Sequence, residues 1–186
     1  MTTRHSALLG ISIAAIIFGA TAGTAHAQSF ASRHGAHTSR FDVEPHFVLG
    51  YGFDRGSGYS SGYGFGVRFG VPLMPHGPTN LNNSLVLSFG ADVTYWNSRF
   101  QHNTFWGTSE VIVPIMLQWN FYLSRWFSFF PEAGVAVGIG GCAGCAFFAA
   151  PGFALGGRVH FDGRAGYPAL VFRIGFPVGF TVGIAF

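Results

Sequence analysis

The chain has 186 residues, a length that fits one domain, and charged residues make up only 9% of it, against roughly a quarter in a typical globular protein. The chain has 28 glycines and 22 phenylalanines, and the phenylalanines make it too aromatic for a disordered chain. Because it has so few charged residues, its composition does not fit the surface of a soluble enzyme. The net charge of +3 comes without a basic cluster, so we expect no nucleic-acid partner.

Residues 1–27 have the pattern of a secretory signal peptide. Arg4 gives a basic start, an apolar run follows over 7–20, and Ala-His-Ala at 25–27 is a small-x-small cleavage site. The apolar run is shorter than the roughly 20 residues that a transmembrane helix needs. We therefore expect a cleaved signal peptide over 1–27, followed by a flexible periplasmic leader over 28–40, which is rich in Ser, His and Arg.

From Phe41 onward, apolar side chains alternate with small or polar ones, which is typical of strands with two different faces. The clearest run is 59–71, where Tyr63, Phe65 and Val67 alternate with glycines and Arg68. Eight such runs follow one another, most of about nine to thirteen residues: 41–51, 59–71, 84–95, 110–121, 127–139, 147–160, 170–174 and 178–186.

These runs predict an all-β fold, an eight-stranded antiparallel transmembrane up-and-down β-barrel over 41–186. An even number of strands lets the sheet close without leaving an unpaired edge in lipid. The bulky face is rich in Phe and the opposite face in Gly, the reverse of a soluble barrel, so we expect the bulky face to contact lipid.

The connections predict an orientation. With a periplasmic N-terminus, the periplasmic turns fall at 72–83, 124–125 and 161–166, and the outer loops at 53–58, 97–108, 140–146 and 175–177. Aromatic residues around 124–125 predict an interfacial belt: Trp119, Phe121, Tyr122, Trp126 and Phe127.

The chain resembles the small eight-stranded outer-membrane barrels of the OmpA and OmpX type over 41–186. The most specific element of the resemblance is the terminal strand FTVGIAF, with apolar residues at every second position. In that family the outer-membrane assembly machinery recognises such a terminal pattern. The resemblance assigns that role here to four residues: Phe180, Val182, Ile184 and Phe186.

A helical hairpin is the alternative fold. No charged residue lies between Glu132 and Arg158, and several glycines there are spaced by four, as in packed transmembrane helices. Against it, Pro151 and the GGCAGC stretch interrupt any single helix.

The alternation places six charged residues on the inner face, three acids and three bases: Glu44, Arg68, Asp92, Glu132, Arg158 and Arg173. Because an eight-stranded barrel is just wide enough for side chains to fill it, these charges must be paired. Glu44 and Arg68 lie at similar heights on adjacent strands, and we expect them to pair. The cluster is interpreted as a polar plug, with a gated ion path as the alternative.

Three further features lie in the outer loops. Cys142 and Cys145 are too few for a zinc site, so a local disulfide is expected in an oxidising compartment, with free thiols as the alternative. Some small barrels hydrolyse or transfer lipid acyl chains with Ser, His and an acid, and the candidates here are Ser98, His102 and Glu110, although no family motif matches. Two arginines are candidates for lipopolysaccharide phosphates, or are simply solvated: Arg55 and Arg99.

Together these features predict a monomeric outer-membrane protein with both termini periplasmic and a structural or interaction role. The partners expected are membrane lipid, lipopolysaccharide, the assembly machinery and periplasmic chaperones. A narrow pore is the first alternative and a lipid-modifying enzyme the second. We expect no enzymatic activity, no cofactor and no metal site.

Overall fold

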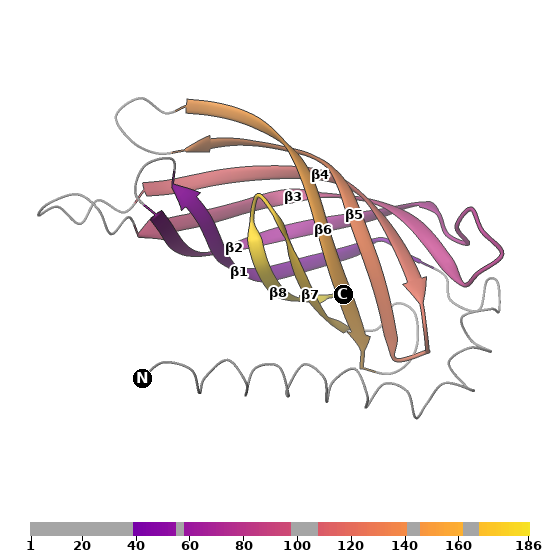
Figure 1. Ribbon diagram of the computed structural model, residues 1–186. Helices are drawn as coiled ribbons and strands as arrows, with labels where there is room; N and C mark the ends of the chain where they lie inside the picture. Colours follow the sequence, from indigo (N-terminus) through magenta and orange to yellow (C-terminus); the bar gives the residue numbers. More distant parts are fainter. Residues whose placement is uncertain (1–38, 55–57, 98–107, 141–145, 162–167) are drawn as a thin grey trace, which may run out of the picture.

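The structure is a computed structural model, and it describes residues 39–54, 58–97, 108–140, 146–161 and 168–186. These residues form eight strands (Figure 1). Six of them have 13 to 17 residues: β1 (Asp42–Asp54), β2 (Gly58–Met74), β3 (Asn83–Asn97), β4 (Thr108–Tyr122), β5 (Phe127–Gly140) and β6 (Ala146–His160). The last two are shorter, with 8 and 7 residues: β7 (Ala169–Phe176) and β8 (Gly179–Ala185).

Each strand pairs antiparallel with the next in the chain, and β8 pairs with β1 to close a barrel. The predicted all-β, eight-stranded antiparallel barrel is confirmed. The helical hairpin between Glu132 and Arg158 is wrong, because this stretch forms β5, β6 and their connection. Within the described residues, no helix has the length and apolarity to cross a membrane.

The two faces of the wall differ as the alternation predicts. Large apolar side chains cover the outer face, where Phe65 is 61% exposed and Phe147 70% exposed. The inner face carries charged and polar side chains that are almost fully buried, such as Glu44 at 1% and Asp92 at 0%. Successive side chains of a strand point to opposite faces, so the period-two pattern alone sorts the residues this way.

Two aromatic or apolar residues lie on the opposite face from the one predicted. Tyr122 was expected in an outer aromatic belt but is buried inside, where its hydroxyl lies 2.9 Å from Ser84 Oγ. Val178 was expected on the outer face of the last strand but lies in the turn between β7 and β8 and is buried in the interior. Tyr122 lies on β4 with the inward phase of Gln118 and Asn120, so the alternation itself places it inside. Val178 lies in a turn, where the alternation of a strand does not apply.

The β7–β8 hairpin ends well short of the neighbouring hairpins (Figure 1). The paired part of β8 reaches only Leu49 on β1, and the paired part of β7 reaches only Phe153 on β6. The wall of the barrel is therefore lower along this hairpin than elsewhere.

Candidate functional site: the charged interior

The six predicted interior charges lie together inside the barrel, and all are buried. They come from six strands: Glu44 from β1, Arg68 from β2, Asp92 from β3, Glu132 from β5, Arg158 from β6 and Arg173 from β7. Most ion pairs among them connect strands that are not neighbours in the sheet, and so they cross the interior. The pair of Arg68 with Asp92 joins the neighbouring strands β2 and β3.

Arg173 is the centre of the cluster. Its Nη1 and Nη2 donate to the two oxygens of Glu44, the second at 2.8 Å, and its Nε donates to Glu132 Oε1 at 3.0 Å. A guanidinium has a planar fork of donors, so one arginine can hold two carboxylates at once. Arg173 therefore links the β1 side of the barrel to the β5 side.

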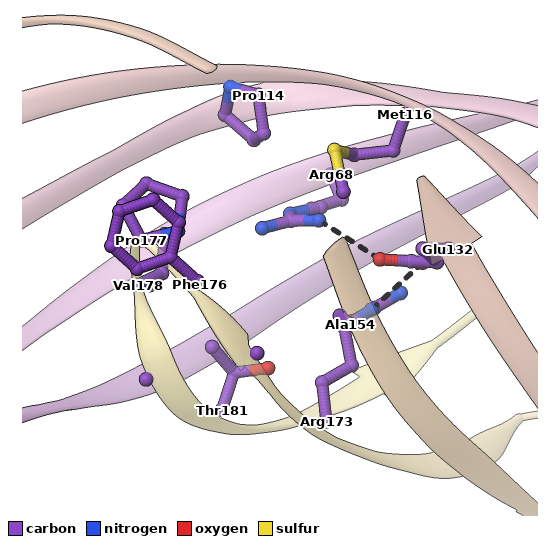
Figure 2. Close-up of a pocket in the computed structure, with 12 residues that line it drawn as sticks. Arg68, Pro114, Met116, Glu132, Ala154, Arg173, Phe176, Pro177, Val178 and Thr181 are labelled. Atoms are coloured by element: carbon purple, nitrogen blue, oxygen red, sulfur yellow. Dashed lines mark hydrogen bonds and ion pairs between the residues drawn. The ribbon is translucent and has the colours of Figure 1, made fainter. Parts of the chain in front are cut away.

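Arg68 forms a second ion pair across the interior. Its Nη1 lies 3.5 Å from Glu132 Oε2 and its Nη2 lies 3.2 Å from Asp92 Oδ2. Figure 2 shows the carboxylate of Glu132 between the guanidinium groups of Arg68 and Arg173. Glu132 is thus bound from both sides, by β2 and by β7.

The predicted pairing of Glu44 with Arg68 is wrong. The two residues are direct register partners on β1 and β2. Their side chains nevertheless reach other groups, because Glu44 pairs with Arg173 and lies 4.0 Å from Arg158. A guanidinium on a long side chain can reach across a narrow barrel as easily as it can reach the strand beside it.

Two members of the cluster were missed from the sequence. Asp42 accepts a hydrogen bond from Arg158, and His46 Nε2 lies 2.7 Å from Asp92 Oδ1. Both are even-numbered residues of β1, on the same face as Glu44, so the alternation already predicts that they point inward. The cluster therefore holds four carboxylates, three guanidinium groups and one imidazole.

One aromatic ring packs within the cluster. Phe130 is 0% exposed, and its ring lies 5.6 Å from the guanidinium carbon of Arg158 and 5.1 Å from that of Arg173. Cation–π attraction holds both guanidinium groups over the ring. Gly156 leaves the space that the ring fills, since a Cβ at this position would overlap the ring of Phe130.

The interior has different chemistry on the two sides of the cluster. Toward the end that carries the C-terminus lies a polar layer in which Ser84 contacts both Tyr122 and Asn120. Toward the other end lies an apolar cluster, which we call the upper interior: Val48, Ile112, Ala136 and Val178, with Phe148 packed against them.

A cavity of about 20 Å³ lies between the cluster and the β7–β8 turn, room for about one water molecule. Its walls include Arg68, Met116, Glu132 and Thr181, together with the β7–β8 turn (Figure 2). Arg68 Nε and Thr181 Oγ1 are buried and have no hydrogen-bond partner in the structure. A single water in this cavity would satisfy such groups.

The residues predicted as an assembly signal lie on β8 or at its end. Val182, Ile184 and Phe186 are exposed on the outer face, and Phe180 is half-buried. Glu110 lies on β4. The other predicted loop features fall outside the described residues: Cys142, Cys145, Ser98, His102, Arg55 and Arg99, as do the signal peptide and nearly all of the leader.

The described side chains form no group of three or more His, Cys, Asp and Glu that is suited to a metal ion. The sequence matches no known protein-family model and no curated protein. The geometry of the site is that of a dense ion-pair network.

Proposed function

We propose that this chain is an integral outer-membrane β-barrel with a structural or interaction role, whose lumen is closed by the ion-pair network. The distribution of side chains supports a membrane setting. Apolar side chains such as Phe65 and Ile174 stand exposed on the outside, while charged side chains are buried inside. In water, exposing the apolar side chains and burying the charged ones would both cost free energy. In a bilayer the exposed apolar side chains lie against lipid.

The ion pairs across the interior are the observation that supports a closed lumen. Arg68 on β2 reaches Glu132 on β5, and Arg173 on β7 joins Glu132 to Glu44 on β1. Side chains that meet in the middle of an eight-stranded barrel leave no continuous water path. The protein would then act through its outer surface and loops, by contacts with lipid, lipopolysaccharide or neighbouring proteins.

The membrane setting is tested by expression with the native N-terminus and separation of the cell membranes. We expect the chain in the outer-membrane fraction, with a heat-dependent shift on a gel, because closed barrels resist detergent until they are heated. A chain found in the soluble fraction, or one without the shift, would overturn the proposal.

The closed lumen is tested by conductance in planar bilayers. The wild-type protein should form no stable channels. The charge-balanced double variant Arg68→Ala with Glu132→Ala should conduct, because it removes both side chains of one crossing ion pair. The matched control is Arg125→Ala, an exposed residue in the β4–β5 turn. Stable wild-type channels that change in the single variant Arg68→Ala would show that the protein is a pore instead.

Enzymatic modification of lipid is tested separately. Lipid A and phospholipids from cells with and without the protein should have the same acyl composition by mass spectrometry. A change that disappears in a Ser98→Ala variant would identify the chain as an acyl-modifying enzyme.

A further inference from the structure

His46 on β1 lies in a closely fitting space inside the barrel. Its side chain is 0% exposed, and so is that of Asp92 on β3. Glycines of the two neighbouring strands face it. A Cβ on Gly66 of β2 would overlap Nε2 of the ring, and a Cβ on Gly183 of β8 would overlap the base of the side chain. The two glycines therefore make room for this imidazole.

Both ring nitrogens of His46 face oxygen atoms that accept hydrogen bonds. Nδ1 lies 3.2 Å from the backbone carbonyl oxygen of Glu44, and Nε2 lies 2.7 Å from Oδ1 of Asp92. A neutral imidazole has one N–H group and one bare nitrogen, whereas an imidazolium has two N–H groups. A neutral ring would turn a bare nitrogen toward an oxygen in either tautomer, so the geometry fits the imidazolium.

The charge balance of the cluster favours the same state. The cluster holds four carboxylates and three guanidinium groups, so a neutral imidazole would leave one negative charge unbalanced. An unbalanced charge away from water is costly. With an imidazolium, the four positive charges equal the four negative ones.

The strands around His46 supply charges of both signs. β8 packs against its side chain with Gly183 and adds no titratable group there. The other charged groups surround the ring directly or through the two carboxylates nearest to it: Glu44 on β1, Arg68 on β2, Asp92 on β3, Arg158 on β6 and Arg173 on β7.

The extra proton belongs to His46 rather than to Asp92. Oδ2 of Asp92 accepts a hydrogen bond from Arg68 at 3.2 Å while Oδ1 faces the imidazole, and contacts of this kind favour an ionised carboxylate. Imidazole is also a stronger base than a carboxylate. The other three carboxylates of the cluster each accept from a guanidinium as well: Asp42, Glu44 and Glu132.

We infer that His46 is a buried imidazolium and that the ion-pair network is a proton-sensitive seal, most stable while this proton is bound. The inference rests on the proposed closure of the lumen by the network and adds the condition on which that closure depends. Loss of the proton leaves a bare ring nitrogen against an oxygen and one unbalanced negative charge. Because the folded chain keeps a proton that the unfolded chain releases, stability is full at lower pH and is lost as the pH rises.

The test measures unfolding by urea at a series of pH values, with the barrel folded in lipid vesicles. From neutral pH to about pH 9, carboxylate and guanidinium groups ordinarily keep their charges, so a change in this range reports other groups. We expect the unfolding equilibrium constant of the wild type to rise with pH, by up to about tenfold per pH unit, the limit for one proton. His46→Gln has no proton to lose and should be less stable at neutral pH and nearly independent of pH.

Two further variants make this comparison specific. His76→Gln, a matched change at an exposed turn residue, should keep the pH dependence of the wild type. The double variant His46→Gln with Asp92→Asn leaves three carboxylates and three guanidinium groups, which balance without a proton. It should fold, as judged by the heat-dependent gel shift, and should lose the pH dependence. This variant keeps the test decisive if His46→Gln alone does not fold.

NMR of the folded wild type, labelled with ¹⁵N at the histidine rings, locates the proton. The two ring resonances of His46 are assigned by their loss in His46→Gln, or in the double variant. At neutral pH both nitrogens should carry a proton.

Three outcomes contradict the inference in different ways. If the variants without His46 keep the pH dependence of the wild type in a barrel that does not conduct, the proton is elsewhere and the closed lumen stands. If one ring nitrogen of His46 is bare at neutral pH, His46 is not the imidazolium, even where the pH dependence is present. If the wild type forms stable channels at neutral pH, the closed lumen itself fails and the inference fails with it.

Discussion

Arg173→Met is the substitution that tests the ion-pair network most directly. Arg173 holds the carboxylates of Glu44 and Glu132 and stacks on Phe130, and its side chain is almost fully buried. Methionine keeps most of the volume but removes the charge. Glu44 then retains only Arg158 and His46, each at 4.0 Å, and Glu132 retains only Arg68, at 3.5 Å.

Breaking a buried ion pair by removing one partner costs about 3–5 kcal/mol, because the other charge is left buried. With a denaturant slope of about 2 kcal/mol/M, this loss lowers the urea midpoint by about 1.5–2.5 M. The free energy of unfolding is measured by urea titration of the protein folded in lipid vesicles, followed by tryptophan fluorescence and by the gel shift.

Three companion variants make the result specific. Arg173→Lys keeps the charge but loses the fork, so its loss should be intermediate. The double variant Arg173→Met with Glu44→Gln should recover part of the stability, because it also removes one unpaired carboxylate. Arg125→Met, in the exposed turn, should stay within about 0.5 kcal/mol of the wild type. A loss under about 1 kcal/mol for Arg173→Met would refute the reasoning, since the carboxylates would then be solvated.

Three other substitutions test further parts of the structure. Gly66→Val should destabilise the barrel by more than about 1 kcal/mol in the same titration, because a Cβ there would overlap the carboxylate of Asp92; no loss would mean that the cluster can move aside. Tyr122→Phe should cost about 1 kcal/mol by removing the hydrogen bond to Ser84, and an unchanged midpoint would place the hydroxyl in water. Phe186→Ala should lower the amount assembled in cells while refolding into vesicles is unchanged; equal amounts in cells would remove the assembly role.

The sequence predicts the face on which each residue lies better than it predicts the residue's partner. Alternation is a local property of a strand, so the inward position of Arg68 or Glu132 follows from its neighbours in the chain. The partner depends on how far a side chain reaches across the barrel. Arg68 therefore bypasses its register neighbour Glu44 and pairs with Glu132, which is 64 positions away in the chain.

The short hairpin shows a similar limit. The alternation near 170–174 is brief, but a brief pattern alone does not distinguish a short strand from a full strand with irregular ends. The structure resolves this through the register of β7 and β8 with their neighbours, which stops at Phe153 on one side and Leu49 on the other. The low wall along this hairpin depends on pairing between distant segments, so no single segment of the sequence predicts it.

The long sequence separations within the network bear on how the barrel unfolds. The acids of β1 are held by arginines that lie much later in the chain, 116 positions away for Asp42 with Arg158 and 129 for Glu44 with Arg173. Because these contacts need β6 and β7 to meet β1, we expect them to form late in folding. Interactions that are absent from the transition state slow unfolding without speeding folding. We therefore expect the network to lower the unfolding rate of the barrel, whatever the rate at which the barrel assembled.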